Sequence, residues 1–217
     1  MDYYNKKYFD WQKDIGKLGG EENLFKFNEF VQKDSKVIDF GSGGGYLLSN
    51  LKCKDKVGIE INQIARDTAN KAGIKTFKTV DEVEDNWADL IISDHALEHV
   101  TNPLSVLQAL FYKLKENGKI VFVVPTEKKN RYKPNDVNFH LYSWSEMNLG
   151  NIFVLAGFEV LQVKEIKHRW PPGFTLIKKT VGHRIFDIIC RLYGHLRPNI
   201  SQIRIVAQRK LKIDHAG

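Results

Sequence analysis

Short apolar runs separated by longer mixed segments recur through the first two thirds of the chain, and they predict alternating strands and helices. Five runs are expected to be strands, at residues 36–40, 56–60, 75–78, 88–94 and 119–125. The segments between them have the length of helices that connect parallel strands. Runs such as "LIIS" and "IVFVV" are apolar at almost every successive position, which is typical of strands buried on both faces. The pattern predicts a doubly wound, Rossmann-like α/β sheet with helices on both faces.

Several boundaries are also readable from the sequence. Asn102 can cap a helix that begins at Pro103 and extends to Lys115, where "ENG" ends it. The segment "EENLFKFNEFVQK", residues 21–33, predicts a helix within an N-terminal helical and aromatic cap at 1–35. The elements expected at the other end are a helix ending at Gly157, a strand at 158–166, a helical insert at 168–199 and a last strand at 200–210. Together these elements predict one domain over 1–217, with a core at 36–166 and a seven-stranded sheet whose last strand is antiparallel.

Composition and charge narrow the class of protein. Cys53 and Cys190 lack the spacing of a disulfide framework or a metal site, which favours a reducing compartment, the cytoplasm. We expect no membrane-spanning helix, because no run of about 18 apolar residues occurs. The net charge of +7 attracts anions of any kind. Its basic residues form short clusters without the interleaved arginine and aromatic residues of RNA-binding surfaces, so nucleic acid is not the expected partner.

A glycine-rich segment, "DFGSGGGY" at 39–46, directly follows the first predicted strand. Glycine clusters occur where the main chain needs positive φ or where a ligand approaches it closely. In an open parallel sheet, ligands bind beyond the carboxyl ends of the strands. A dinucleotide-binding fingerprint does not fit, because its third glycine would fall at Tyr46. A phosphate-binding loop does not fit either, because no Gly-Lys-Ser/Thr follows the glycines. The pattern that fits is D-x-G-x-G-x-G, formed by Asp39, Gly41, Gly43 and Gly45.

A second acid, Glu60, ends the second predicted strand 19 residues after Gly41. A carboxylate at that place can accept both hydrogens of a ribose diol. Either Asp39 or Glu60 alone could be a strand-end cap, but their joint register favours a nucleoside site. With these motifs the chain resembles the class I S-adenosylmethionine-dependent methyltransferases. The resemblance implies S-adenosylmethionine as cofactor, with S-adenosylhomocysteine as product. The resemblance places the glycine loop, with Ser42, against the aminoacyl part of the cofactor and Asp39 near its amino group. It places Glu60 on the ribose and Ile61 on the adenine, with Thr79 or Val80 at the adenine edge.

The segment "HALEH", residues 95–99, matches the H-x-x-E-H signature of a zinc protease. That site needs both histidines on one long helix, whereas here the next helix is expected only from Pro103. We therefore expect no metal site. The resemblance instead implies that Ser93, Asp94 and His95 border the sulfonium and its methyl group, largely through backbone atoms, and that His99 holds the turn.

Methyl transfer needs an aligned acceptor and a route for its proton. The segment "VNFHLYSWSEM" resembles the "HLYxxS" stretch before the last helix of many small-molecule members of this superfamily. His140 is the candidate base, because imidazole exchanges protons near neutral pH, and Tyr142 is a second candidate. Packing or capping is the alternative role of both.

Two further segments have open interpretations. The aromatic N-terminus could cover the cofactor and exclude water, or simply pack; its residues are Tyr3, Tyr4, Tyr8, Phe9 and Trp11. The insert could bring basic side chains to a phosphate group or an apolar face to a lipid surface or a partner chain, or dock on the sheet; those side chains are Lys178, Lys179, Arg184 and Arg191.

The function predicted from the sequence is transfer of a methyl group from S-adenosylmethionine to an oxygen or nitrogen of a small molecule, by a monomer or homodimer. The "YFDWQ" and "LEHV" segments are similar to enzymes of bacterial glycan and polysaccharide gene clusters, which implies a sugar or glycan precursor as acceptor. An RNA or protein methyltransferase and a non-catalytic cofactor-binding protein are the alternatives. A salt-dependent affinity for RNA would favour the former.

Overall fold

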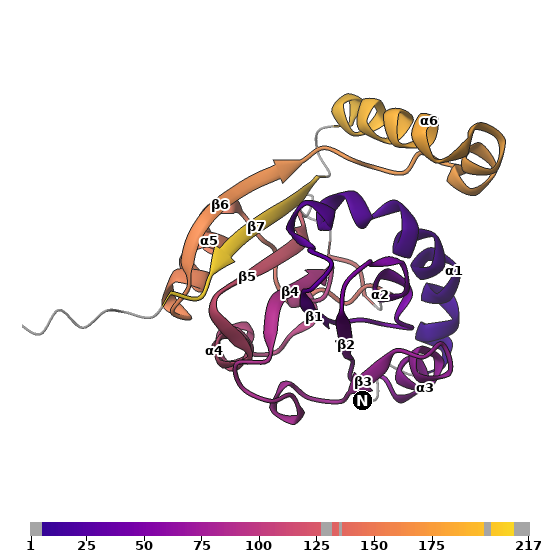
Figure 1. The fold of residues 1–217 in the computed structure, drawn as a ribbon. Helices are drawn as coiled ribbons and strands as arrows, with labels where there is room; N and C mark the ends of the chain where they lie inside the picture. Colours follow the sequence, from indigo (N-terminus) through magenta and orange to yellow (C-terminus); the bar gives the residue numbers. More distant parts are fainter. Residues whose placement is uncertain (1–5, 127–131, 135, 198–200, 211–217) are drawn as a thin grey trace, which may run out of the picture.

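The computed structural model describes residues 6–126, 132–134, 136–197 and 201–210, with side chains from residue 13 onward. In these ranges seven strands form one sheet in the order β3-β2-β1-β4-β5-β7-β6 (Figure 1). The first five strands are parallel, and β7 runs antiparallel to both of its neighbours. The strands are β1 Lys36–Phe40, β2 Asp55–Ile59, β3 Lys75–Phe77, β4 Ala88–Asp94, β5 Leu114–Pro125, β6 Glu159–Ile166 and β7 Gln202–Gln208. The predicted Rossmann-like fold with an antiparallel last strand is confirmed.

Helices flank this sheet, and their local caps follow the sequence. Asn102 accepts a hydrogen bond from the Ser105 N–H and Pro103 opens the next helix, as predicted. Ser145 and Asn148 form a reciprocal capping box at the start of α5. The helices are α1 Lys6–Glu22, α2 Tyr46–Asn50, α3 Gln63–Lys71, α4 Pro103–Lys113, α5 Glu146–Leu155 and α6 Phe174–Leu196, and the short 3₁₀ turns are η1 Leu24–Lys26, η2 Asn28–Phe30, η3 Val80–Glu82 and η4 Leu97–His99.

The core lies on both faces of the sheet, because successive side chains of a strand point to opposite faces. On β1, Val37 belongs to the cluster that contains Leu47 and Leu48 of α2, whereas Ile38 belongs to the cluster that contains Leu107 of α4. The strands β4 and β5 alternate in the same way. Two buried faces explain why the centres of these strands are continuously apolar.

Several predicted boundaries need correction. The fifth strand, predicted at 119–125, begins at Leu114 and includes the "ENG" segment. Residues 21–33 are not one helix: α1 ends at Glu22, and η1 and η2 follow. Long-range burial overrides the local pattern there, since Lys26 and Phe27 are both fully buried against distant parts of the chain. The helix from Pro103 ends at Lys113 rather than Lys115, because Leu114 already pairs with Ala88 of β4. The insert helix α6 is interrupted at Gly182, whose φ of 74° and ψ of 174° are not helical.

The insert lies outside the two helical layers, beyond the end of β6 and next to α1 (Figure 1). Ion pairs join it to the end of α1: Lys178 Nζ lies 2.7 Å and His183 Nδ1 lies 3.0 Å from carboxylate oxygens of Glu22. Within the described ranges, no helix has both the length and the apolar character needed to cross a bilayer.

Candidate active site

A cavity of about 1020 Å³ opens at the carboxyl ends of the parallel strands. Its wall contains the residues predicted to bind the cofactor except Gly45 and Ser93: Asp39, Gly41, Ser42, Gly43, Glu60, Ile61, Thr79, Asp94 and His95. Val80 also lines it. The topology explains why these residues lie together. The strand order reverses at β1, which lies between β2 and β4, and the residues that follow the strands meet at this point.

Gly45 and Ser93 support the cavity from behind. Gly45 precedes α2 with φ of +75° and packs against Ala69 and Ile74. The Ser93 hydroxyl donates a hydrogen bond of 2.8 Å to the Phe40 carbonyl, which joins β4 to β1. Neither residue lines the cavity; both hold the elements that form its wall.

The glycine loop leaves main chain open to the cavity. A β-carbon at Gly41, where φ is +77°, would lie only 2.3 Å from the Ala96 β-carbon. Gly43 has φ of +52°, and a β-carbon there would enter empty space. The Ser42 hydroxyl is buried beside them and has no hydrogen-bond partner among the described residues. Bare backbone and an unused hydroxyl are the features expected around the aminoacyl part of S-adenosylmethionine.

Glu60 follows β2 and is oriented by the backbone. One carboxylate oxygen accepts from the Gly43 N–H at 2.9 Å, and the other accepts from the Asn62 N–H at 2.7 Å. Burial raises the pKa of Glu60, and these two backbone donors offset part of that effect. A carboxylate can accept about four hydrogen bonds, so both oxygens can still accept from a ribose diol. Ile61 lies beside it and is 63% exposed, which leaves an apolar surface for a flat ring.

Asp39 ends β1 almost completely buried. Burial, together with the charges of Asp94 and Glu60, raises the pKa of Asp39 well above its ordinary value. A cation placed beside the carboxyl would favour its ionised form. Asp39 therefore suits the amino group that the sequence prediction places there.

Replacement of Asp39 with asparagine should stabilise the free protein and weaken cofactor binding. Because the folded-state pKa is raised, the folded protein holds this proton to higher pH than the unfolded chain does, and stability falls as pH rises from about 3.8 through the folded-state pKa. We expect Asp39→Asn to have the higher Tm at pH 8, with the difference vanishing near pH 3. Its affinity for S-adenosylmethionine should fall about tenfold, because a charge-assisted hydrogen bond is lost. Thermal melts across pH measure the change in stability, and calorimetry measures the change in cofactor affinity. Equal melting curves of the two proteins at pH 8 would contradict the expected gain in stability.

Asp94, at the end of β4, is held by two residues that the sequence analysis missed. The Asn23 amide donates to one carboxylate oxygen and the Lys26 ammonium donates to the other, each at 2.8 Å. Both partners line the cavity, and Lys26 is only 1% exposed. No local pattern marks a lysine that pairs with an acid 68 residues away. This clamp fixes the wall of the cavity where the methyl group is expected.

The helix α1 covers the glycine loop through its own glycines. A β-carbon at Gly20 would lie 2.6 Å from the Tyr46 backbone, and one at Gly16 would lie 2.9 Å from the Tyr46 ring. Tyr46 therefore occupies a groove that only glycines leave open. The proposed aromatic lid stays a prediction: Tyr3 and Tyr4 lie outside the described residues, and the side chains of Tyr8, Phe9 and Trp11, which belong to α1, are outside the described side chains.

The "HALEH" residues do not lie on one helix. His95 follows β4 with φ of 59°, the next three-residue turn is η4, and α4 begins only at Pro103. His95 Nδ1 lies 3.5 Å from a carboxylate oxygen of Glu98. Burial lowers the pKa of His95, but its contact with the Glu98 carboxylate and the charge of Asp94 raise it by more. The arrangement differs from that of a zinc protease.

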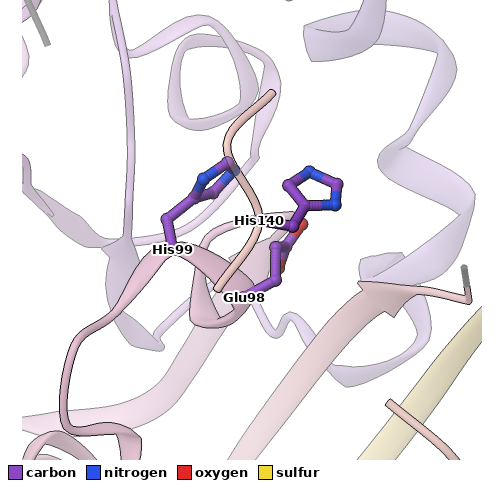
Figure 2. A group of neighbouring side chains, drawn as sticks. All are labelled: Glu98, His99 and His140. Carbon is purple, nitrogen blue, oxygen red and sulfur yellow. The ribbon is translucent and has the colours of Figure 1, made fainter. Parts of the chain in front are cut away.

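The candidate catalytic residues lie behind the cavity wall. The loop before α5 is fixed to η4, because the N–H groups of Leu141 and Tyr142 donate to the Glu98 carbonyl at 2.9 and 3.3 Å. The rings of His140 and His99 lie next to each other (Figure 2) and pack edge-on, with centroids 4.8 Å apart. His99 also lines the cavity. Burial lowers the pKa of His99. The Tyr142 hydroxyl donates to the Thr101 carbonyl at 3.0 Å, which gives it a structural contact.

The four basic side chains predicted to meet a phosphate group do not line the cavity. Lys178 pairs with Glu21 and Glu22, and Arg191 pairs with Asp187 of its own helix at 2.8 Å. Lys179 and Arg184 are exposed. The segment before the insert helix does reach the cavity, through His168, Arg169 and Trp170. Burial lowers the pKa of His168 to about 4, so its imidazole is neutral at physiological pH.

Comparison with known proteins identifies the family. Residues 17–163 match the family described as "Methyltransferase domain". Ubiquinone biosynthesis O-methyltransferase of Vibrio campbellii is 32% identical over 117 residues, which are 46% of this chain and 50% of that protein. The enzyme of that name from Yersinia enterocolitica is 28% identical over 134 residues, 56% of this chain and 50% of its own length. The chain thus spans about half the length of these curated relatives.

Solved structures share the fold at low sequence identity. A Thermotoga maritima S-adenosylmethionine-dependent methyltransferase, described as a possible histamine N-methyltransferase, has a TM-score of 0.66 at 17% identity and covers 93% of this chain and 95% of its own. An S-adenosylmethionine-dependent methyltransferase from Archaeoglobus fulgidus has a TM-score of 0.64 at 18% identity. The match covers 93% of this chain and 99% of that one. The family match extends over more than half of the chain and includes the glycine loop and Glu60. The chain therefore belongs to the methyltransferase-domain family, and it shares the fold of S-adenosylmethionine-dependent methyltransferases.

Proposed function

We propose that this protein transfers a methyl group from S-adenosylmethionine to a hydroxyl oxygen of a small molecule, with a nitrogen as the alternative acceptor atom. The observation that carries the proposal is one cavity lined both by the cofactor residues and by His99, whose ring contacts His140. The cavity volume, about 1020 Å³, is at the upper end of small-molecule sites. The O-methyltransferase names of the curated relatives support an oxygen acceptor.

The residues divide the work between binding and proton transfer. S-adenosylmethionine supplies, when bound, a methyl group activated by a positively charged sulfur. The glycine loop and Asp39 would hold its aminoacyl part and Glu60 its ribose, which would direct the methyl group toward Asp94 and His95 in the cavity wall. The acceptor oxygen would take the methyl group as the carbon–sulfur bond breaks. The acceptor proton passes to the imidazole pair of His99 and His140, while Tyr142 positions that loop through Thr101.

The acceptor class and the setting of the protein are part of the same proposal. A sugar or glycan precursor, to which the sequence resemblance points, offers hydroxyl groups of the required kind. The two cysteines are unpaired, Cys190 is buried, and burial raises the pKa of its thiol to about 12. These features support a reducing, cytoplasmic location.

Replacement of His140 with alanine should lower kcat about 100-fold, because a positioned proton acceptor contributes roughly 10²-fold or more. The dissociation constant for S-adenosylmethionine should stay within about twofold, since His140 does not line the cavity. Formation of S-adenosylhomocysteine with a panel of hydroxyl and amine acceptors measures turnover, and calorimetry measures binding. The matched control is His195→Ala, which removes an exposed imidazole of α6.

Unchanged kcat in His140→Ala would remove this residue from proton transfer. Cofactor binding by the wild type without turnover on any acceptor would instead favour a non-catalytic role.

A further inference from the structure

A completely buried carboxylate, Glu98, lies in η4 behind the cavity wall. Neither of its oxygens accepts a hydrogen bond of ordinary geometry from the described residues. His95 Nδ1 lies 3.5 Å from one of these oxygens. Burial of an ionised carboxylate without strong partners is costly, so the site calls for a cation or several donors.

Two further imidazoles face this carboxylate. A carboxylate oxygen of Glu98 and one ring nitrogen each from His99 and His140 all lie within 4.8 Å of one another (Figure 2). Glu98 and His99 come from the turn after β4, whereas His140 comes from the loop that precedes α5. The grouping therefore depends on the tertiary fold and differs from the H-x-x-E-H reading, which pairs His95 with His99.

The backbone presents these side chains to one another. The N–H groups of Leu141 and Tyr142 bind the Glu98 carbonyl and hold the His140 loop on η4. The residue before His140, Phe139, has φ of 46°, which bulky residues rarely adopt. The backbone of Phe139 also hydrogen-bonds with the His99 ring. Ligand histidines are commonly oriented in this way, by a backbone group on the ring nitrogen that does not bind metal.

We propose that Glu98, His99 and His140 bind one divalent transition-metal ion, with Zn²⁺ as the best match. Two imidazoles and one carboxylate are a ligand set of catalytic zinc, which keeps a fourth position open. Mg²⁺ and Ca²⁺ prefer oxygen ligands, so they fit this set less well. Neighbouring ligand atoms of tetrahedral zinc lie about 3.3 Å apart. The three ligand atoms here lie within 4.8 Å of one another, so each separation has to shorten by at most about 1.5 Å.

The role of the ion rests on the proposed function, although its binding does not. His99 lines the cavity, so the open position faces the space for the acceptor. An acceptor hydroxyl bound there loses its proton to water at lower pH than a free hydroxyl does. In the metal-bound protein His99 and His140 are both ligands, so the acceptor proton passes to water instead of to the imidazole pair. Cofactor binding and the direction of methyl transfer are the same in both cases.

A second group of possible ligands provides a matched control. Glu21, Glu22 and His183 also lie within 4.8 Å of one another, where α1 meets α6. Lys178 pairs with both carboxylates there, and its ammonium already supplies the positive charge. We therefore expect this second group to bind no metal.

The test uses the full chain, freed of metal with a chelator and titrated with Zn²⁺, and separately with Co²⁺ as a spectroscopic probe. We expect one equivalent of Zn²⁺ per chain, a rise in Tm on binding, and visible Co²⁺ absorption typical of tetrahedral sites. Glu98→Gln and His140→Ala should weaken Zn²⁺ binding at least about 100-fold. His183→Ala should bind Zn²⁺ as the wild type does.

Substoichiometric Zn²⁺ binding by the wild type would overturn the proposal, as would wild-type affinity in both Glu98→Gln and His140→Ala. Loss of binding in His183→Ala alone would place the ion at the second group and overturn it as well. S-adenosylhomocysteine formation, measured on the same samples, separates this result from the proposed function. Turnover without metal binding contradicts only the metal site, and metal binding without turnover contradicts only the methyltransferase activity.

Discussion

Replacement of Glu60 with alanine is expected to raise the dissociation constant for S-adenosylmethionine about 100-fold. The carboxylate is fixed by the N–H groups of Gly43 and Asn62, so it meets a ribose diol without reorienting. A hydrogen bond to a charged group contributes about 1.5–3 kcal/mol, and the loss of two such bonds, partly replaced by water, amounts to roughly 3 kcal/mol. That free energy corresponds to about a hundredfold in affinity. Calorimetric titration of the folded variant measures it.

Two further variants separate the diol contact from the loop contact. Glu60→Gln keeps the size of the side chain but places an NH₂ group against one of its two backbone donors, so we expect an intermediate loss of affinity. Glu84→Gln removes an equal charge from an exposed position outside the cavity wall and should leave binding unchanged. Affinity within threefold of the wild type in Glu60→Ala would mean that the diol is not held by this carboxylate.

The part of the fold that was predictable is the part with local signals. The strand limits at Lys36–Phe40 and Ala88–Asp94 match the apolar runs, because burial on both faces makes the centre of each strand continuously apolar. The helix start at Pro103 was readable because a cap and a proline act on the residues next to them. The glycine loop and Glu60 were readable together, because adjacent parallel strands bring their carboxyl ends to one edge.

The missed features depend on contacts between distant residues. Lys26 was assigned to a helix because its neighbours follow a helical pattern, yet its partner is Asp94. The glycines of α1 have no evident role until Tyr46 is seen against them. Glu98 and His140 are 42 positions apart, and only the loop fixed on η4 brings them together. A search for ligands at fixed spacing therefore found His95 and His99 and passed over His140.

Replacement of Lys26 with methionine is expected to lower the free energy of unfolding by about 3 kcal/mol. The ammonium group is 1% exposed and lies 2.8 Å from the Asp94 carboxylate, which is itself only 15% exposed. Removal of one partner of a buried ion pair leaves the other charge uncompensated, which typically costs about 3–5 kcal/mol. We expect a loss at the lower end of this range, because Asn23 still donates a hydrogen bond to Asp94 in the variant. Urea unfolding of both proteins under the same conditions measures the difference.

A double variant shows whether the loss comes from the pair or from packing. Lys26→Met combined with Asp94→Asn removes both charges, so it should be more stable than Lys26→Met alone by about 1 kcal/mol or more. Equal stability of the single and double variants would mean that methionine merely packs badly. Because Asp94 and Lys26 line the cavity, the single variant should also bind S-adenosylmethionine more weakly. An ion pair that joins the segment after α1 to the end of β4 thus couples the stability of the fold to the shape of the cofactor site.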